Sequence, residues 1–245
     1  MRRIKLTLGY IGTAYSGWQR QPNQDTVQSR LEDAIFTLTK ERVSLQGSGR
    51  TDAGVHAIGQ VAHFDTNSSL PIKNFVTGVN HFLPADIRVE KAEEVDENFH
   101  ARFSATEKTY NYYLYESPFD KAVYLNRATR VKDKLSVKKM SDSAQAFLGE
   151  HDFTSFMSTG ADTTGAVRTI TELKVERKDG LIRITVSANG FLYNMVRLIV
   201  GVLIRAGKGE IDKNGISQLI LMQSKDAVRE VMPACGLYLK SVKYD

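Results

Sequence analysis

A change in the spacing of apolar residues near the start of the chain limits the possible folds more than any other feature. Residues 3–9 alternate polar and apolar side chains, the period of a strand with one buried face. Residues 25–40 then follow a helical period, with Asp25 and Gln28 at capping-box spacing. The apolar face of this helix consists of Val27, Leu31, Ala34, Ile35 and Leu38. Strand-like segments at 43–45 and 59–64 complete a βαβ-like opening.

A second series of elements begins near Thr109 with an aromatic strand that contains Tyr110, Tyr112, Tyr113 and Tyr115. A helix over 137–147 ended by Gly149 follows, and then two strands, 170–176 and 181–188, joined by a turn at Asp179-Gly180. Residues 191–206 are apolar on all sides and predict a buried helix that Gly207 stops. A helix over 216–222 and a strand over 236–242 end the chain. We therefore predict an α+β fold with two subdomains, 1–104 and 105–245.

Composition excludes several classes of protein. The single cysteine, Cys235, permits neither an intrachain disulfide nor a Cys-based zinc site, which suits a reducing cytoplasm. The N-terminus lacks the apolar stretch of a signal peptide, and the most apolar region, 191–204, is interrupted by Asn194 and Arg197 and is too short to span a membrane. We expect a soluble, cytoplasmic protein with no membrane contact. The formal charge of +5 favours polyanions only if the basic residues gather on one face.

Residues 46–56 have the most unusual local sequence, with three glycines and both charge signs between two strands. Glycines let the backbone approach a ligand closely, so this loop can present Arg50 and Asp52 at a cleft. The alternative is a tight turn in which Asp52 is only a cap. The glycines match neither a P-loop nor a dinucleotide fingerprint, and the histidines lack the spacing of a helical metal site. We expect no nucleotide cofactor, no other cofactor and no metal.

The loop resembles a known enzyme family. Residues 49–56, Gly-Arg-Thr-Asp-Ala-Gly-Val-His, are similar to the signature loop of the TruA-type tRNA pseudouridine synthases, in which the aspartate is essential. Further similar segments occur in the family's order at 9–21, 59–61, 78–80, 99–105, 152–156, 191–197 and 236–239. Asn194 stands where many relatives have His, and 125–139 and 159–168 match no segment of the family.

The resemblance implies an isomerase that converts uridine to pseudouridine, which needs neither redox equivalents nor an energy source. It implies that Asp52 is the catalytic nucleophile, whether it attacks the ribose, attacks the base or acts through a glycal. Arg197 is implied as the cation paired with Asp52, although an arginine there can also extend into solvent. Tyr110 is implied as the platform for the target uracil, although a tyrosine in such an aromatic strand can also be a core residue, as the other tyrosines of the strand are expected to be. Arg50 is expected to bind RNA, its alternative role being a surface charge.

The resemblance also implies the substrate and the assembly. The family modifies positions 38, 39 and 40 in the anticodon arm of tRNA, and it acts as a homodimer. It implies two similar subdomains with antiparallel sheets flanked by helices around a central RNA-binding cleft. A basic stretch can track phosphates or be a solvated helix face: Arg127, Arg130, Lys132, Lys134, Lys138 and Lys139.

Two alternatives stay open. One is a noncatalytic tRNA-binding or chaperone protein on the same fold, and the other is a small-molecule hydrolase that uses Asp52 as its nucleophile.

Overall fold

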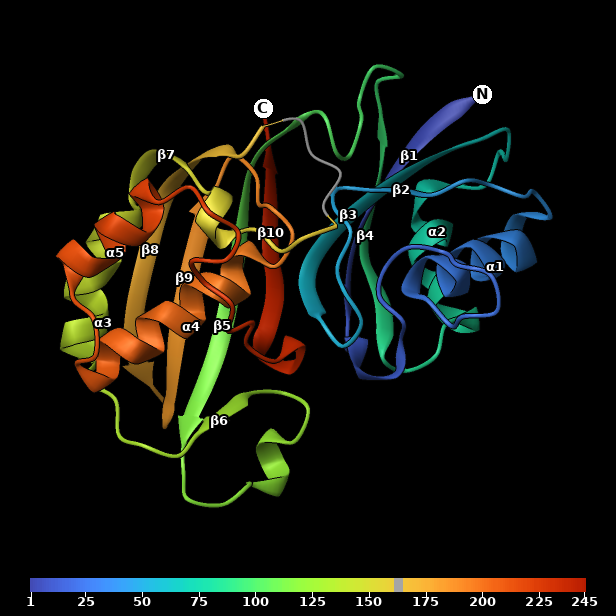
Figure 1. The fold of residues 1–245 in the computed structure, drawn as a ribbon. Helices are drawn as coiled ribbons and strands as arrows, with labels where there is room; N and C mark the ends of the chain where they lie inside the picture. Colours follow the sequence, from blue (N-terminus) through green and yellow to red (C-terminus); the bar gives the residue numbers. More distant parts are fainter. Residues whose placement is uncertain (161–164) are drawn as a thin grey trace. The chain divides into compact units, whose positions relative to one another are not determined.

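The computed structural model describes residues 1–160 and 165–245, which form two compact units. Unit 1 comprises Met1–Thr106 and Tyr238–Asp245, and unit 2 comprises Glu107–Leu237. Each unit combines one sheet with helices, so the predicted α+β class is confirmed (Figure 1). The boundary between the units in sequence lies close to residue 104, but the end of the chain, Tyr238–Asp245, belongs to unit 1.

The sheet of unit 1 has the strand order β4-β1-β3-β10, and a short strand, β2, also pairs with β3. Its strands are β1 (Arg2–Tyr10), β2 (Gln46–Gly47), β3 (His56–Thr66), β4 (Ile87–Val95) and β10 (Leu237–Tyr244). β1 runs antiparallel to β3 and β4, whereas β10 runs parallel to β3. The predicted alternation of β1 is confirmed, since Ile4, Leu6 and Leu8 are fully buried. Helices α1 (Val27–Thr39) and α2 (Ile72–Phe82) lie together beside this sheet (Figure 1).

Three local predictions for unit 1 differ from the structure. The capping box of α1 is formed by Thr26 and Ser29, not by Asp25 and Gln28, because the Asp25 carboxylate binds Arg30 at 2.6 Å. Residues 43–45 form no strand, since the backbone N–H and C=O of Leu45 are bound by side chains of α1. The sequence pattern predicted no elements between 72 and 95, where α2 and β4 lie.

The sheet of unit 2 has the order β5-β9-β8-β7, with β6 parallel to β5 and the other neighbours antiparallel. Its strands are β5 (Ala105–Glu116), β6 (Thr129–Val131), β7 (Gly149–Asp152), β8 (Val167–Lys178) and β9 (Leu181–Ala188). The predicted hairpin between β8 and β9 is confirmed, because Asp179 and Gly180 have φ of 51° and 78°, as a type I′ turn requires. Helices α3 (Val137–Ala144), α4 (Met195–Lys208) and α5 (Lys213–Leu221) gather on one side of this sheet (Figure 1).

The helix α4 is buried on nearly all sides, as its sequence predicts. It begins later than predicted, at Met195, because Asn194 has a left-handed backbone with φ of 61°. It also continues through Gly207 to Lys208, and the residue that caps it, Gly209, has φ of 83°. A Cβ on Gly207 would lie 2.9 Å from Met140 Cγ, so this glycine lets α3 and α4 approach closely instead of ending the helix.

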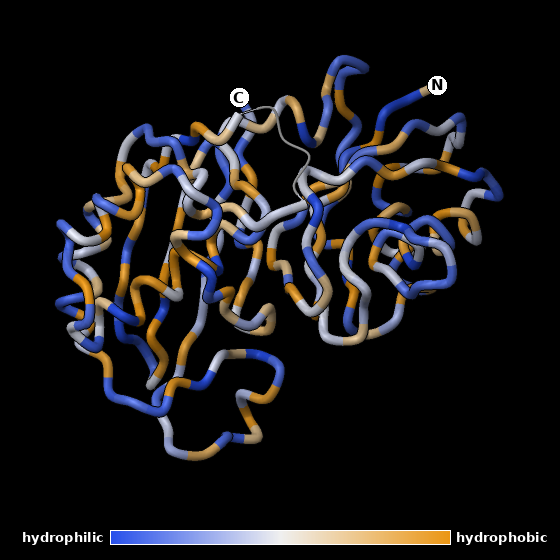
Figure 2. The backbone as a smooth tube through the Cα atoms, in the orientation of Figure 1, coloured by the Kyte–Doolittle hydropathy of each residue, from blue (hydrophilic) through white to orange (hydrophobic). Residues whose placement is uncertain are grey.

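The other boundaries in unit 2 shift by a few residues. The predicted helix over 137–147 is α3 followed by a 3-10 turn at Gln145–Phe147, and the helix over 216–222 is α5. Further 3-10 turns lie at Gly12–Ala14, Ala122–Tyr124, Thr154–Phe156 and Ala234–Gly236. Figure 2 shows apolar residues recurring along the strands and helices of both units. Among the described residues, no helix has both the length and the hydropathy needed to cross a bilayer.

Candidate active site

The loop that carries Asp52 connects β2 to β3 and is closed by short-range contacts. The backbone N–H of Val55 donates to the carbonyl of Asp52 at 3.1 Å, and Gly54 has φ of 78°. Thr51 is buried, Asp52 is half-buried and Arg50 is exposed. The loop therefore holds its backbone in the protein while it leaves the Asp52 side chain partly accessible.

A network of buried polar side chains fixes the loop from the protein interior. Ser48 Oγ donates to Gln60 Oε1 at 2.7 Å, and Gln60 Nε2 donates to the carbonyl of Gly49 at 3.1 Å. Tyr10 Oη lies 2.7 Å from Thr51 Oγ1. Burial raises the pKa of Tyr10 to about 12, although its hydrogen bonds to Thr51 and Gln60 oppose the rise. Tyr10 is therefore neutral near pH 7 and keeps its hydroxyl hydrogen for this network.

A second backbone segment packs directly on the loop. The N–H of Trp18 donates to the carbonyl of Thr51 at 2.9 Å. Gly17 has φ of 90°, and a Cβ there would lie 2.6 Å from the Thr51 oxygen. A Cβ on Gly12 would lie 1.9 Å from the Val55 oxygen. These two glycines are needed because any side chain would push the segment away from the Asp52 loop.

Arg197 lies in the first turn of α4 and is held by two neighbours. Its Nε donates to the carbonyl of Met232 at 2.5 Å, and its Nη1 donates to Asn194 Oδ1 at 2.8 Å. Asn194 Nδ2 in turn donates to Ser158 Oγ at 2.9 Å. These contacts orient the guanidinium group, so the alternative of an arginine that merely extends into solvent does not describe it.

Tyr110 lies on β5, half-buried, with its ring edge-on to Phe191 at a centroid distance of 5.1 Å. Tyr112 is two residues further and therefore on the same face of the strand. Tyr112 Oη donates to the carbonyl of Pro233 at 2.6 Å, next to the Met232 carbonyl that binds Arg197. Tyr112 and Arg197 thus both bind the backbone of residues 232–233, whereas the ring that Tyr110 contacts is that of Phe191. Tyr112 and Tyr115 are core residues as predicted, whereas Tyr113 is half-buried.

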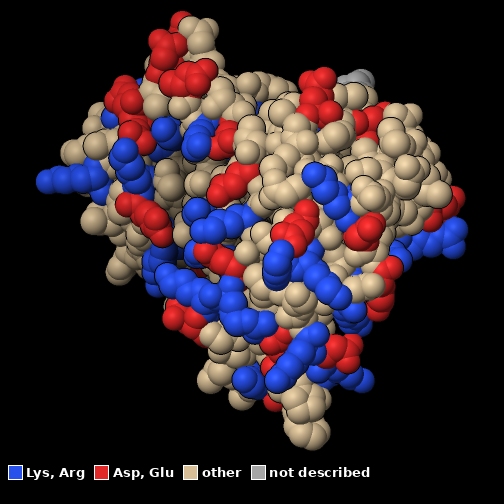
Figure 3. Space-filling view, turned by 90° about the vertical axis from the view of Figure 1, so that its left-hand side faces the viewer, with Lys and Arg blue, Asp and Glu red and all other residues tan. Residues whose placement is uncertain are grey.

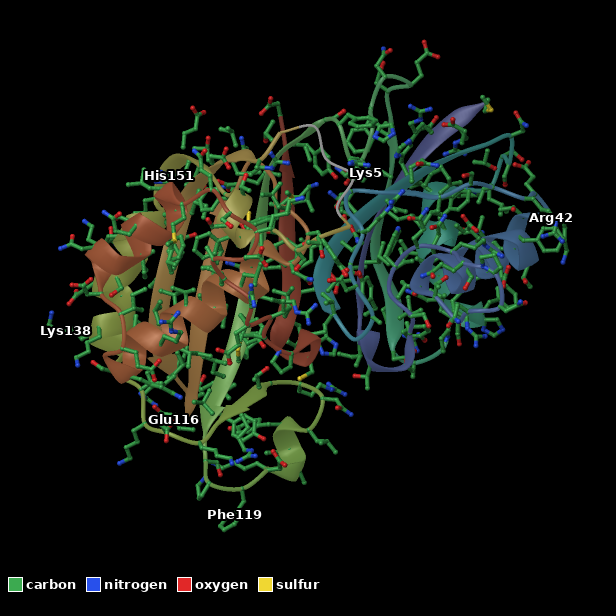
Figure 4. The ribbon with its side chains drawn as sticks, in the orientation of Figure 1. Lys5, Arg42, Glu116, Phe119, Lys138 and His151 are labelled. Atoms are coloured by element: carbon green, nitrogen blue, oxygen red, sulfur yellow. The ribbon has the colours of Figure 1, made fainter. Side chains whose placement is uncertain are left out.

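The predicted basic stretch covers β6, the following loop and the start of α3. Arg130 binds Asp120 and Lys138 binds Asp142, each at 2.8 Å, so part of its charge is neutralised within the protein. Lys132, Lys134 and Lys139 are exposed. Figure 3 views the molecule from the side on which Lys138 is labelled in Figure 4. On this face acidic side chains lie among the Lys and Arg side chains. This face is mixed in charge.

Sequence reasoning assigned no role to two side chains that fix the loop, Tyr10 and Gln60. The sequence does indicate that Gln60 is unusual, because Gln60 is a polar residue that shares a strand face with Ala62 and Phe64, which are buried. A polar residue on a buried face needs a hydrogen-bonding group nearby. Its position just after the glycine-rich loop then points to that loop.

Known proteins of similar sequence match this chain along its whole length. A family model described as tRNA pseudouridine synthase matches residues 8–104 and 143–245, which include Arg50, Asp52 and Arg197 but not Tyr110. The tRNA pseudouridine synthase A of Acetivibrio thermocellus is 46% identical over 244 residues, with 100% of both chains covered. The protein of that name from Ruminiclostridium cellulolyticum is 45% identical over 245 residues, again with 100% of both chains covered.

The tRNA pseudouridine synthase A of Bacillus subtilis is 42% identical over 246 residues, with 99% of both chains covered. Among solved structures, a chain of a Cbf5-Nop10-Gar1 complex is 12% identical, and the match covers 82% of this chain and 54% of that one. Its TM-score of 0.32 is too low to support an argument.

Proposed function

The chain belongs to the tRNA pseudouridine synthase family, and on this basis we propose that it isomerises uridines of the tRNA anticodon arm with Asp52 as its nucleophile. As a member of the family it is an isomerase that acts on tRNA. The observation that carries the assignment of Asp52 is the way its loop is fixed. Tyr10, Gln60 and Trp18 hold the backbone around a side chain that is itself partly accessible.

The reaction suits a carboxylate. The N1–C1′ bond of uridine breaks, a C5–C1′ bond forms, and the hydrogen on C5 leaves to solvent while N1 takes up a proton. Substrate and product are isomers, so no oxidant, reductant or energy source is consumed. Attack on the sugar carbon, attack on the base and removal of a sugar proton would each use the same carboxylate of Asp52.

We assign three further side chains to the substrate and the reaction. Arg197 is the cation that favours the ionised form of Asp52, and its two fixed hydrogen bonds support a positioned role. Tyr110 is the platform for the extruded uracil, because extruded bases stack on aromatic side chains and Tyr110 is only half-buried. Arg50 binds RNA, since it is exposed and two residues from Asp52.

The substrate positions and the assembly follow from the family. We propose positions 38, 39 and 40 of tRNA as the targets, a homodimer as the active form and the cytoplasm, where tRNA is found, as the location. Mapping of pseudouridine in treated tRNA tests the positions. Light scattering of the purified protein tests the dimer.

The central experiment measures tritium release from tRNA labelled at C5 of uridine. Wild type and Asp25→Asn should release tritium equally, because Asp25 is a surface residue whose carboxylate binds Arg30. Asp52→Asn and Asp52→Ala should release none while they still bind tRNA. Release by a folded Asp52→Ala variant at the rate of wild type would remove Asp52 from the mechanism. A wild type that binds tRNA but releases nothing would favour the noncatalytic alternative.

A further inference from the structure

Phe103 is a large apolar side chain that the fold leaves in solvent. It is 75% exposed and lies in the short segment 96–104 between β4 and β5. Burying such a ring is worth roughly 1.5–3 kcal/mol, which the protein does not gain at this position. A single exposed apolar residue needs no explanation by itself. The structure around Phe103 is what suggests a function for it.

The backbone that carries Phe103 is fixed by its own turn. The N–H of His100 donates to Ser104 Oγ, and the N–H of Ser104 donates to the carbonyl of His100, both at 2.9 Å. The N–H groups of Arg102 and Phe103 both point at His100 Nδ1, at 3.1 and 3.3 Å. Four hydrogen bonds thus fix the backbone from which the Phe103 side chain extends.

Side chains of the unit 1 sheet hold this turn in place. The N–H of Ala101 donates to His63 Nδ1 at 3.1 Å, and Tyr244 Oη donates to the carbonyl of Ala101 at 2.8 Å. Arg3 Nη1 donates to the carbonyl of Phe99 at 2.9 Å. Lys5, labelled in Figure 4, lies over the Phe99 ring with its Nζ 5.5 Å from the centroid. The turn is therefore anchored to β1, β3 and β10.

Three side chains of the turn form an aromatic shelf: His100, Arg102 and Phe103. The His100 ring lies 4.4 Å from the Phe103 ring at an interplanar angle of 33°, and Arg102 Cζ lies 5.6 Å from the Phe103 centroid. Burial and the charges of Arg3 and Arg102 lower the pKa of His100. The histidine is therefore an uncharged ring near pH 7, and the positive charge of the shelf belongs to Arg102.

We propose that this aromatic shelf stacks a nucleobase of the tRNA substrate. An aromatic face beside a guanidinium group is the combination that binds unstacked RNA bases and their phosphates. A shelf fixed before binding loses little conformational entropy when the base arrives. A single ring is too small a patch for a stable protein interface. The proposal deepens the proposed function, because the nucleic acid it names is the substrate of the same enzyme.

The experiment measures the affinity of unmodified tRNA for Phe103 variants at several salt concentrations. Phe103→Leu keeps an apolar side chain but removes the π face, and Phe103→Trp keeps that face. We expect Phe103→Leu and Phe103→Ala to weaken binding about 5- to 100-fold, as loss of one stacked base does, with the salt slope unchanged. Phe103→Trp should bind as wild type does.

The matched control is Phe82→Leu, a second exposed phenylalanine of unit 1 that also touches a histidine ring, His81, but lies at the end of α2. It should leave tRNA affinity unchanged. Wild-type affinity of folded Phe103→Leu and Phe103→Ala, or a Phe103→Trp variant as weak as Phe103→Ala, would overturn the proposal. Because the readout is tRNA affinity and not product formation, failure of the Asp52 assignment would show in tritium release alone.

Discussion

The hydroxyl of Tyr10 at the end of β1 lies 2.7 Å from the hydroxyl of Thr51, the residue before the proposed nucleophile. Both residues are buried, and 41 positions of sequence separate them. This contact joins the central strand of unit 1 to the loop that carries Asp52. The position of the carboxylate therefore depends on a side chain that does not itself react.

Replacing Tyr10 by Phe removes this hydroxyl and keeps the ring. We expect kcat to fall about 10-fold, because small displacements of a reacting group are costly, while KM for tRNA changes little. Stability should fall by about 1–2 kcal/mol, because Thr51 loses a buried hydrogen bond.

Tyr15→Phe is the matched control, since Tyr15 Oη donates to Asp86 at 2.6 Å in the same unit. It should lose comparable stability and keep kcat. Steady-state kinetics and urea unfolding check both variants. Equal kcat for Tyr10→Phe and wild type would show that the contact serves folding only.

Gly17→Ala tests the close approach of the backbone to the Asp52 loop. The new Cβ would meet the Thr51 oxygen at 2.6 Å and would also impose φ of 90° on an alanine. Gly149→Ala provides the control. Gly149 has φ of 93°, but beyond its chain neighbours no described residue comes within 4 Å of the place that a Cβ would occupy.

Gly149→Ala should cost about 1–2 kcal/mol, the strain of a left-handed residue, and leave activity intact. Gly17→Ala should cost more and lower activity, because the clash moves the loop. Thermal unfolding and tritium release measure the two effects. Equal losses of stability in the two variants, with activity retained, would argue against a role for the contact.

Arg197→Lys tests whether the fixed guanidinium group matters or only its charge. Lysine cannot reproduce the planar donor set that reaches both the Met232 carbonyl and Asn194. We expect kcat/KM to fall about 10- to 100-fold while the positive charge is retained. Arg205→Lys, on the same helix and close to Glu210, should behave as wild type in the same assay. Full activity of Arg197→Lys would mean that charge alone suffices.

His63 makes stability depend on pH. Burial, helped by the charges of His100 and Arg3, lowers its pKa from 6.5 to about 4. Between these values the unfolded chain binds a proton that the folded chain does not, so stability falls as pH decreases from 6.5 to 4. The loss attributable to His63 should be about 2 kcal/mol between pH 7 and 5.

Urea unfolding at pH 7 and pH 5 measures this loss. His63→Gln should show a smaller difference between the two pH values, because glutamine does not titrate but can still accept the Ala101 N–H. His81→Gln removes an exposed histidine of the same unit and should leave the difference unchanged. An undiminished difference in His63→Gln would assign the pH dependence to other groups.

The local sequence pattern predicted an element where the structure of a segment depends mainly on that segment itself. The period of residues 25–40 predicted α1, the apolar run predicted the buried helix α4, and Asp179-Gly180 predicted its hairpin. The unusual composition of residues 46–56 pointed to a candidate functional loop, and its likeness to a family signature singled out Asp52. These features depend on neighbours in sequence, which a single chain displays directly.

Sequence patterns thus predicted the α+β class and the helices α1, α3, α4 and α5, but not α2, and the resemblance to a family pointed to Asp52. Tertiary packing was needed to place β10 in the sheet of unit 1, with Tyr238 beside His56. It was also needed to show that Tyr10 and Gln60 fix the Asp52 loop and that the Met232 carbonyl holds Arg197. The physical reason is the same for each: buried polar groups must find hydrogen bonds, and the groups that satisfy them are chosen by packing between segments far apart in the chain.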